Sequence, residues 1–332
     1  MTISVPFEDT PIHVARVASP TPSAEERAAL RESLTRPVPE VPPRYFYDDL
    51  GSELFEQITQ LPVYYQTRTE IAILEQFAED IMAKTQPIRV VELGSGAGRK
   101  IRLLLDAWRP APLGATCVML DINELFLRTS LERLSADYGP LRFQGVVGDF
   151  VQDLERLGPM GRRLIVFFAG TMGNLAPGER HSFLRTLAAG MDTTDSFLVG
   201  VDLVKDHAQL KAAYDDPEGV TAAFNKNMLA VVNRRFDGNF DPDSFEHRAF
   251  YDADNAWIEM RLVSTRRQTA DLRAINLSLA LESGDELRTE ISCKFTRESL
   301  MRDAARAGLS VQAWYVDPDS LFALALLQKG VS

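Results

Sequence analysis

A buried strand that runs directly into a glycine loop and a helix constrains the fold of this chain more than any other feature. Residues 88–93, IRVVEL, form the short continuous apolar run typical of a central parallel strand. The loop GSGAGRK follows, and Gly94, Gly96 and Gly98 permit positive φ and close backbone approach to a bound group. KIRLLLDAWR then reads as a helix, whose N-terminus offers unpaired N–H groups. This unit predicts an open α/β sheet that binds a ligand at the carboxyl ends of its strands.

Strands and helices continue to alternate through the middle of the chain. ATCVML ends at Asp121, RFQGVV runs into Asp149 and Phe150, and RRLIVFFAG runs into TMGN. A helix over roughly 178–189 then leads to SFLVGVDL. This spacing predicts a parallel sheet with right-handed crossovers.

The pattern changes between residues 205 and 294. Two helical runs are followed there by hairpin-like strands around WIEMRLVS and LRAINLSLAL, which predict an insertion that builds a second domain. After residue 294, the helix TRESLMRDAARAG precedes two closing strands, LSVQAWYV and SLFALALLQ, joined by a short turn. The first 22 residues are rich in Pro, Ser and Thr, and we expect this N-terminus to be disordered.

Composition excludes several classes of protein. The 332 residues carry a formal net charge of −11, which disfavours nucleic acid and anionic membranes as partners. No stretch approaches the length of a membrane span, and no signal peptide is seen. Cys117 and Cys293 read as buried free thiols, so we expect a cytoplasmic protein. Separately, we expect the protein to be a monomer. No His or Cys spacing suits a metal site, and we expect no metal.

The loop and the next two strand ends suggest which cofactor binds. The glycines are spaced as G-x-G-x-G, neither the dinucleotide pattern nor a phosphate-binding P-loop. Asp121 can accept hydrogen bonds from both ribose hydroxyls of a cofactor. The alternative is that Asp121 only forms part of the turn after its strand. Asp149 can accept from an adenine amino group, with Phe150 against the ring. Together with the closing strand pair, which Rossmann-like methyltransferases show, these positions predict S-adenosylmethionine as the cofactor, with a dinucleotide dehydrogenase as the rival.

Another pair of polar residues lies in the strand ELRTEISCKF. Period-two alternation puts Glu290 and Ser292 on one face, and Ile291 and Cys293 on the other. A solvated face is one explanation of the pair. The other is that it binds something polar and specific.

Long blocks of the chain resemble the histidine-specific Nα-methyltransferase family of ergothioneine biosynthesis. They run in order from about residue 40 to the C-terminus. The blocks are FYDDLGSELFEQITQLPVYYQTRTE, VELGSGAGRK, GDF, GTMGNL, VDLVKD, AYDDPEGVTAAFNKNMLAVVNR and TEISCKF.

The resemblance implies roles for individual residues. Those implied to contact the methyl donor are Gly94, Lys100, Asp121, Asp149 and Phe150, and we add Gly96 from the loop itself. Those implied to bind the amino-acid substrate are Tyr64, Asn174 and Tyr214 at its backbone end, Glu290 and Ser292 at its imidazole, and Met260 beside the ring.

The resemblance also implies the reaction, which is trimethylation of the α-amino group of L-histidine to the betaine hercynine, the first step of ergothioneine biosynthesis. The proton acceptor for the amine is not identified by the sequence, and Tyr47 or a water route is the candidate. Tyr47 and Phe55 could stabilise the growing cation. The alternatives are the same chemistry on another amino acid such as tryptophan, or a non-catalytic S-adenosylmethionine-binding module.

The expected fold is therefore α/β, a Rossmann-like class I methyltransferase sheet with an inserted α+β substrate-binding domain. We expect the methyltransferase domain to comprise residues 69–203 and 295–332. The substrate domain is expected to combine the N-terminal helices of residues 23–68 with the insertion at 204–294.

Overall fold

The structure is a computed structural model, and it describes residues 12–16, 21–154 and 160–330. The chain divides into two compact units. The first unit contains Gln66–Val204 and Cys293–Ser332 together with the N-terminal segment up to Ala18. The second contains Ser19–Tyr65 and Lys205–Ser292. The chain therefore passes between the units at 65/66, 204/205 and 292/293, as well as near its N-terminus.

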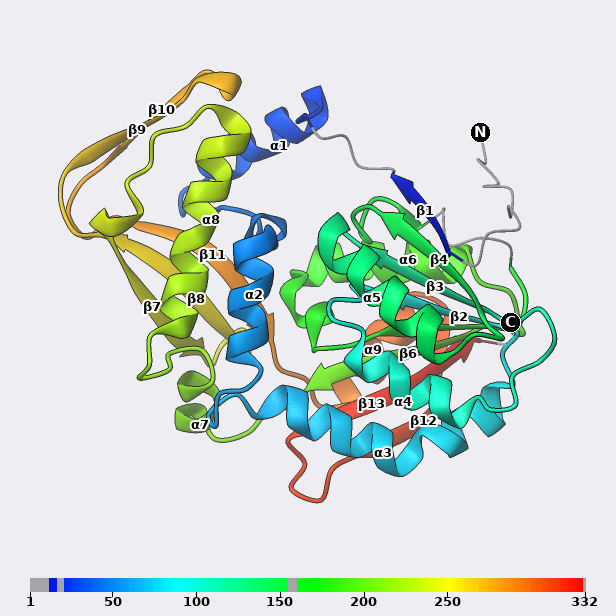
Figure 1. The fold of residues 1–332 in the computed structure, drawn as a ribbon. Coiled ribbons are helices and arrows are strands. Elements are labelled where there is room, and N and C mark those ends of the chain that lie inside the picture. Colours follow the sequence, from blue (N-terminus) through cyan, green and yellow to red (C-terminus); the bar gives the residue numbers. More distant parts are fainter. Residues whose placement is uncertain (1–11, 17–20, 155–159, 331–332) are drawn as a thin grey trace. The chain divides into compact units, whose positions relative to one another are not determined.

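An eight-stranded sheet forms the centre of the first unit (Figure 1). Its strands follow the order β1-β4-β3-β2-β5-β6-β13-β12. Neighbouring strands are parallel from β1 to β6, whereas β13 is antiparallel to both β6 and β12. The bounds are β1 Ile12–Arg16, β2 Arg89–Leu93, β3 Thr116–Asp121, β4 Arg142–Val147, β5 Arg163–Phe167, β6 Ser196–Asp202, β12 Leu309–Val316 and β13 Phe322–Lys329. The expected parallel sheet and closing strand pair are confirmed.

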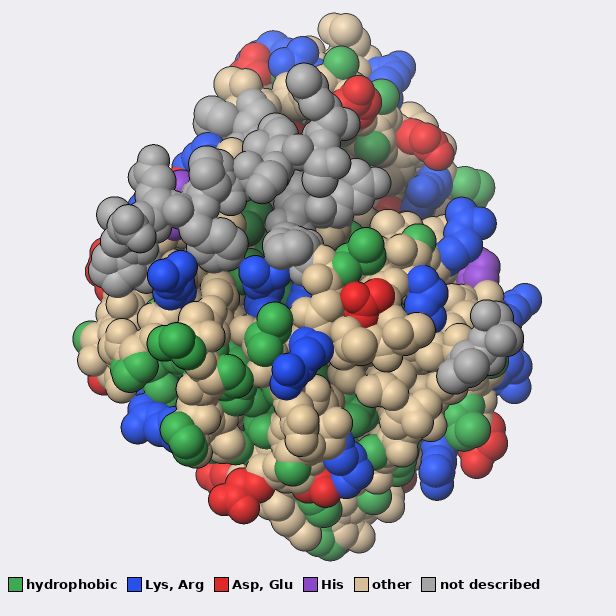
Figure 2. All heavy atoms as spheres, turned by 90° about the vertical axis from the view of Figure 1, so that its right-hand side faces the viewer, with side chains coloured by type: hydrophobic (Ala, Val, Ile, Leu, Met, Phe, Trp, Pro, Cys, Tyr) green, Lys and Arg blue, Asp and Glu red, His purple; other side chains and the backbone are tan. Residues whose placement is uncertain are grey.

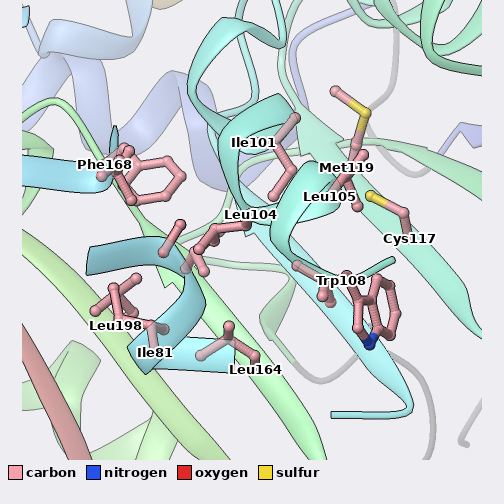
Figure 3. Close-up of a cluster of buried hydrophobic side chains, with 14 of the residues drawn as sticks. Ile81, Ile101, Leu104, Leu105, Trp108, Cys117, Met119, Leu164, Phe168 and Leu198 are labelled. Atoms are coloured by element: carbon pink, nitrogen blue, oxygen red, sulfur yellow. The ribbon is translucent and has the colours of Figure 1, made fainter. Parts of the chain in front are cut away.

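Helices cover both faces of this sheet. Apolar side chains of α3, α4 and α5 share one buried cluster with residues of the strands. Figure 3 shows part of this cluster, including Leu104 of α4, Cys117 of β3 and Leu164 of β5. On the opposite face, Phe183 of α6 packs against Phe167 of β5, with 5.3 Å between the ring centroids. The helices are α3 Tyr65–Thr85, α4 Arg99–Ala107, α5 Glu124–Asp137, α6 Pro177–Ala189 and α9 Arg297–Arg306, with a 3₁₀ turn, η3, at Thr171–Asn174.

The expectation of a disordered N-terminus is wrong for residues 12–16. They form β1, which pairs in parallel with β4 from Ile12 opposite Phe143 to Arg16 opposite Val147. The segment IHVAR has the β-branched and alternating character of an edge strand, and the open edge of β4 offers it unpaired backbone groups. Residues 1–11 and 17–20, also covered by that expectation, lie outside the described residues.

The second unit is α+β and contains a three-stranded sheet in the order β11-β8-β7 and a separate hairpin of β9 and β10. β7 and β8 are antiparallel, with His247 opposite Leu262 and Ala249 opposite Met260. Its helices and 3₁₀ turns are α1 Ala24–Leu34, η1 Pro43–Phe46, α2 Asp49–Ile58, α7 His207–Ala212, α8 Val220–Phe236, η4 Pro242–Ser244 and η5 Arg273–Ile275. Its strands are β7 Phe245–Asp252, β8 Trp257–Ser264, β9 Gln268–Leu272, β10 Leu277–Leu281 and β11 Glu286–Cys293, whose last residue belongs to the first unit.

The face drawn in Figure 2 carries charges of both signs, and both cysteines are buried. On the face drawn in Figure 2, basic and acidic side chains are scattered among uncharged ones, outside the grey atoms. Cys117 and Cys293 are buried and unbridged, as expected. None of the described helices is both long and apolar enough to cross a bilayer.

Candidate functional site

The glycine loop lies where the strand order of the sheet reverses. From β2 the chain proceeds through β3 to β4 on one side, and then returns to β5 on the other side of β2. Ligands of open α/β sheets bind outside the carboxyl ends of the strands at such a switch point. Gly94, Gly96 and Gly98 all have positive φ, of 69°, 49° and 66°. Gly98 is the N-cap of α4, so the loop delivers the backbone directly into a helix N-terminus.

Asp121 ends β3 and is tied to that loop. One carboxylate oxygen accepts from the backbone N–H of Gly96 at 2.8 Å, and the other accepts from the N–H of Asn123 at 2.9 Å. Burial raises the pKa of this carboxyl, and the backbone N–H groups of Asn123 and Gly96 oppose the rise. A carboxylate oxygen has two lone pairs, so the side chain keeps acceptor capacity for hydroxyl groups while its orientation is fixed.

Lys100, on the first turn of α4, is held by a buried acid. Its ammonium forms an ion pair with Glu70 of α3, which is fully buried. The Glu70 carboxylate also accepts from the backbone N–H of Ala169, at 2.9 Å to the nearer oxygen. Ala169 has a positive φ of 64°, so Glu70 stabilises an unusual conformation in the loop after β5. The three segments α3, α4 and the β5 loop are thereby fastened together within the first unit.

Asp149 and Phe150 follow β4, and Asn174 ends the 3₁₀ turn after β5. An Asp149 carboxylate oxygen accepts from the N–H of Val151 at 2.9 Å, which orients the side chain. The Phe150 ring packs edge-on against Phe167, with 4.9 Å between centroids. The first unit therefore carries Gly94, Gly96, Lys100, Asp121, Asp149, Phe150 and Asn174 at the carboxyl ends of β2, β3, β4 and β5.

The second unit holds the remaining predicted residues. The Tyr214 hydroxyl and Ser292 Oγ share a hydrogen bond of 2.8 Å, and both side chains are buried. Glu290 lies two residues before Ser292 on β11 and is half-buried. Met260 is buried on β8, and its carbonyl accepts from the Thr289 hydroxyl at 3.1 Å, which ties β8 to β11. Tyr214 and Ser292 are thus brought into direct contact from segments 78 residues apart.

Aromatic rings gather around Tyr47 and Tyr64 in the same unit. Phe55 lies edge-on to both, with centroid distances of 6.0 Å to Tyr47 and 6.1 Å to Tyr64. Phe224 of α8 completes the group at 5.9 Å from both Tyr47 and Phe55, and stacks on Phe46 at 4.4 Å. The negative faces of such rings can stabilise a cation.

Comparison with known proteins shows which family the chain belongs to. A family model described as histidine-specific methyltransferase, SAM-dependent, matches residues 26–329. The chain belongs to this family. The histidine N-alpha-methyltransferase of Mycolicibacterium smegmatis is 44% identical over 300 residues, covering 90% of this chain and 94% of that protein. That of Mycobacterium tuberculosis is 42% identical over 289 residues, covering 87% and 90%.

Among solved structures, an S-adenosylmethionine-dependent methyltransferase from Clostridium acetobutylicum aligns with a TM-score of 0.47 and 9% identity. The alignment covers 84% of this chain and 99% of that one. The resemblance stated from the sequence blocks is confirmed by the family match, and so is the Rossmann-like class I methyltransferase sheet.

The first unit of this histidine-specific methyltransferase has polar atoms that suit the methyl donor. Glu92, near the end of β2, is 2% exposed, and among the residues that the structure describes its Oε2 has no hydrogen-bond partner. The buried Oγ of Ser95 in the glycine loop likewise has no hydrogen-bond partner within the described part of the chain. Burial raises the pKa of Glu92 well above its ordinary value, with Asp121 and Glu70 adding to the rise and Lys100 opposing it. S-adenosylmethionine carries an ammonium, a carboxylate and two ribose hydroxyls, so unsatisfied acceptors and a nearby lysine fit this group.

Four residues of the two units, Glu92, Glu70, Phe224 and His247, were not expected from the sequence to take part in the site. Glu92 had a signal, because it is an acid inside the apolar run IRVVEL directly before the loop. Glu70 and Phe224 lie in helices whose periodicity does not set them apart. His247, which contacts the backbone of Tyr214, is a lone histidine without metal-ligand spacing. Among the described residues, no three His, Cys, Asp or Glu side chains are grouped so as to hold a metal ion.

Proposed function

We propose that this protein transfers three methyl groups, one at a time, to the α-amino group of L-histidine, giving hercynine in the first step of ergothioneine biosynthesis. S-adenosylmethionine supplies the methyl groups. The observation that carries the proposal is the match to histidine N-alpha-methyltransferases at 42–44% identity over almost the whole length of both chains.

Six residues of the first unit bind the donor in this proposal. Asp121 accepts from the ribose hydroxyls, and its two backbone hydrogen bonds keep it in position to do so. Asp149 and Phe150 bind the adenine, by an amino hydrogen bond and ring contact. Gly94 and Gly96 allow the backbone to approach, and Lys100 provides a cation for the donor's carboxylate.

The imidazole of the substrate is bound by Glu290 and Ser292. The carboxylate accepts from one ring nitrogen, and the hydroxyl donates to or accepts from the other. The 2.8 Å bond between Tyr214 and Ser292 supports this role because it fixes the hydroxyl. Met260 contacts the ring. A hydrogen bond to a charged group contributes roughly 1.5–3 kcal/mol, enough to discriminate histidine from amino acids without those nitrogens.

The backbone end of the substrate is bound by Tyr64, Asn174 and Tyr214. Holding both ends of histidine aims its nitrogen while the substituents on that nitrogen change. Tyr47, or a water that it orders, accepts the proton of the amine. The rings of Tyr47 and Phe55 stabilise the methylated cation, and the contact of both with Phe224 supports a shared aromatic surface.

Mass spectrometry of L-histidine incubated with the protein and S-adenosylmethionine tests the proposal directly. The expected product has gained three methyl groups, and the other amino acids give none. Trimethylated tryptophan instead would favour the alternative substrate and overturn the roles of Glu290 and Ser292. Donor binding without any product would indicate a binding module.

We further propose that the enzyme acts in the cytoplasm as a monomer, without a nucleic-acid or membrane partner and without a metal. Its acidic charge and its two buried, unbridged thiols support this. Light scattering coupled to gel filtration should give the mass of one chain, and activity should survive a chelator.

A further inference from the structure

His247, on β7, connects two parts of the second unit through its ring nitrogens. Nε2 lies 2.8 Å from the backbone carbonyl oxygen of Tyr214, in the turn after α7. Nδ1 lies 2.8 Å from Nδ2 of Asn225, on α8. The proposed substrate-binding function has no direct use for either His247 or Asn225.

The partners of the ring determine its protonation state. A carbonyl oxygen can only accept, so Nε2 carries the proton, and the Asn225 amide nitrogen can only donate, so Nδ1 is bare. The same Asn225 nitrogen donates to the carbonyl of Arg261 at 3.2 Å. Turning the amide around would direct its oxygen at that carbonyl oxygen, which is unfavourable. The imidazole is therefore neutral, with its proton on Nε2.

Tyr214 is the residue that this ring holds in place. The backbone N–H of Tyr214 donates to the carbonyl of Lys211 at 2.9 Å, and its hydroxyl contacts Ser292. With His247 bound to the carbonyl oxygen, the peptide groups on both sides of Tyr214 are fixed. A shift of that carbonyl would displace the phenol ring and the Ser292 hydroxyl with it.

We infer that neutral His247 is a positioning residue for the amino-acid substrate, acting through the Tyr214 carbonyl on the Tyr214–Ser292 pair. This inference rests on the proposed function and extends it to a residue that does not touch the substrate. Protonation of the ring would place a second N–H against the Asn225 amide donor and remove one hydrogen bond.

The surroundings of the ring favour the neutral form. Burial lowers the pKa of His247, opposed by the hydrogen bond to the Tyr214 carbonyl and by two nearby acids. On β8 the residue opposite is the apolar Leu262. The charged and titratable neighbours among the described residues are His207 and Lys211 from α7, Asp215 and Asp216 from the turn after it, Lys226 from α8, and Arg248 and Tyr251 on β7 itself.

Calorimetry on three full-length variants tests the inference. The quantities are the Kd of L-histidine in the presence of S-adenosylhomocysteine, which prevents turnover, and the Kd of S-adenosylhomocysteine alone. His247→Phe should weaken histidine binding about tenfold, the usual effect of losing one hydrogen bond to a buried group. His247→Gln should retain most of the affinity at pH 8, because its amide can still donate to the carbonyl. His207→Gln, the matched control, should bind like the wild type, and all should bind S-adenosylhomocysteine equally.

A pH series separates positioning from a merely structural role. Between pH 8 and pH 5 the wild type should lose more histidine affinity than His247→Gln, which has no ring to protonate. At each pH, ionisation of the substrate affects the wild type and His247→Gln equally, so its effect cancels in the ratio of their Kd values for histidine. Unchanged histidine binding in His247→Phe, or equal losses for both ligands, would overturn the inference while leaving the proposed function intact. Failure of the wild type to bind histidine would overturn both.

Discussion

Glu92 and Glu290 are both acids on strands, but their surroundings differ. Glu92 is buried, and no described residue forms a hydrogen bond with its Oε2, so its ionised form is strongly disfavoured in the absence of a ligand. Glu290 is half-buried on β11 beside the Tyr214–Ser292 hydrogen bond. We therefore expect their substitutions to affect different ligands and, for Glu92, to affect stability as well.

Replacing Glu290 with Ala should weaken histidine binding roughly 10- to 100-fold, because it removes the charged partner of the imidazole. The Kd of S-adenosylhomocysteine should stay within about twofold, since the donor contacts other residues. Isothermal titration calorimetry measures both values. Glu246→Ala, an exposed acid on β7, is the control and should change neither. Comparable losses for the two ligands would contradict the assigned role.

Glu92→Gln should make the ligand-free protein more stable and the donor complex weaker. Because burial raises the pKa of Glu92 in the folded state, the unfolded state loses its proton first as pH rises above 4.5. The wild type therefore loses stability from this group with increasing pH up to the folded pKa, whereas glutamine does not ionise. With an unfolding entropy of about 2.1 cal/mol/K per residue, a gain of 1 kcal/mol would raise the Tm by about 1–2 °C in a chain of 332 residues.

Thermal melts of Glu92→Gln and wild type at pH 5 and pH 8 should show the gap widening with pH. Glu132→Gln, at an exposed position on α5, is the control, and its Tm should equal that of the wild type at both pH values. An equal Tm for Glu92→Gln and wild type at both pH values would mean that Glu92 is ionised without cost.

The strand β6 carries a glycine where the fold has no room for a side chain. A Cβ at Gly200 would lie 2.0 Å from Oε1 of Glu70 and 3.0 Å from the Phe322 ring. The buried carboxylate that holds Lys100 and the Ala169 N–H therefore occupies the space that this glycine leaves on the sheet. The packing of α3 on β6 and the position of Lys100 depend on the same residue.

Gly200→Ala should destabilise the protein by about 1–3 kcal/mol, the usual cost of overpacking. It should also raise the Kd of S-adenosylhomocysteine, because Glu70 must move and Lys100 with it. Gly178→Ala is the control: this glycine is exposed on α6 and has open space around its Cβ position. That change should be neutral or stabilising by up to ~1 kcal/mol. Urea unfolding measures the stability of both variants, and calorimetry measures their Kd for S-adenosylhomocysteine. If Gly200→Ala behaved like Gly178→Ala in both measurements, the steric argument would be refuted.

Over the whole molecule, the chain passes between its two units close to a buried polar cluster. Lys294 and Asp202 form an ion pair at 2.9 Å with side chains 0% and 3% exposed. Gln66 donates to the same carboxylate at 3.4 Å. These three residues lie within two positions of the crossings at 292/293, 204/205 and 65/66. The three crossing segments are thus fixed to one another inside the first unit.

Lys294→Ala should cost about 3–5 kcal/mol of unfolding free energy, because it leaves a buried carboxylate without its cation. Arg267→Ala breaks an ion pair whose side chains are 84% and 66% exposed, and should cost at most ~1 kcal/mol. The double change Lys294→Met with Asp202→Asn should recover much of the loss, since neither charge remains. Urea denaturation measures all three. If Lys294→Ala cost no more unfolding free energy than Arg267→Ala, the buried cluster would not fix the three crossing segments to one another.

The sequence by itself determined the order of elements, the glycine loop, the acids at the strand ends and the family. These follow from local periodicity, glycine conformational freedom and long contiguous blocks. It did not reveal β1, whose stability depends on the distant β4 edge rather than on its own five residues. Only the tertiary structure decided that Glu70 reaches Lys100, that Phe224 joins Tyr47, and that His247 holds Tyr214. Each of these contacts joins side chains from different elements, and no local pattern in a chain encodes which distant partner a buried polar group will meet.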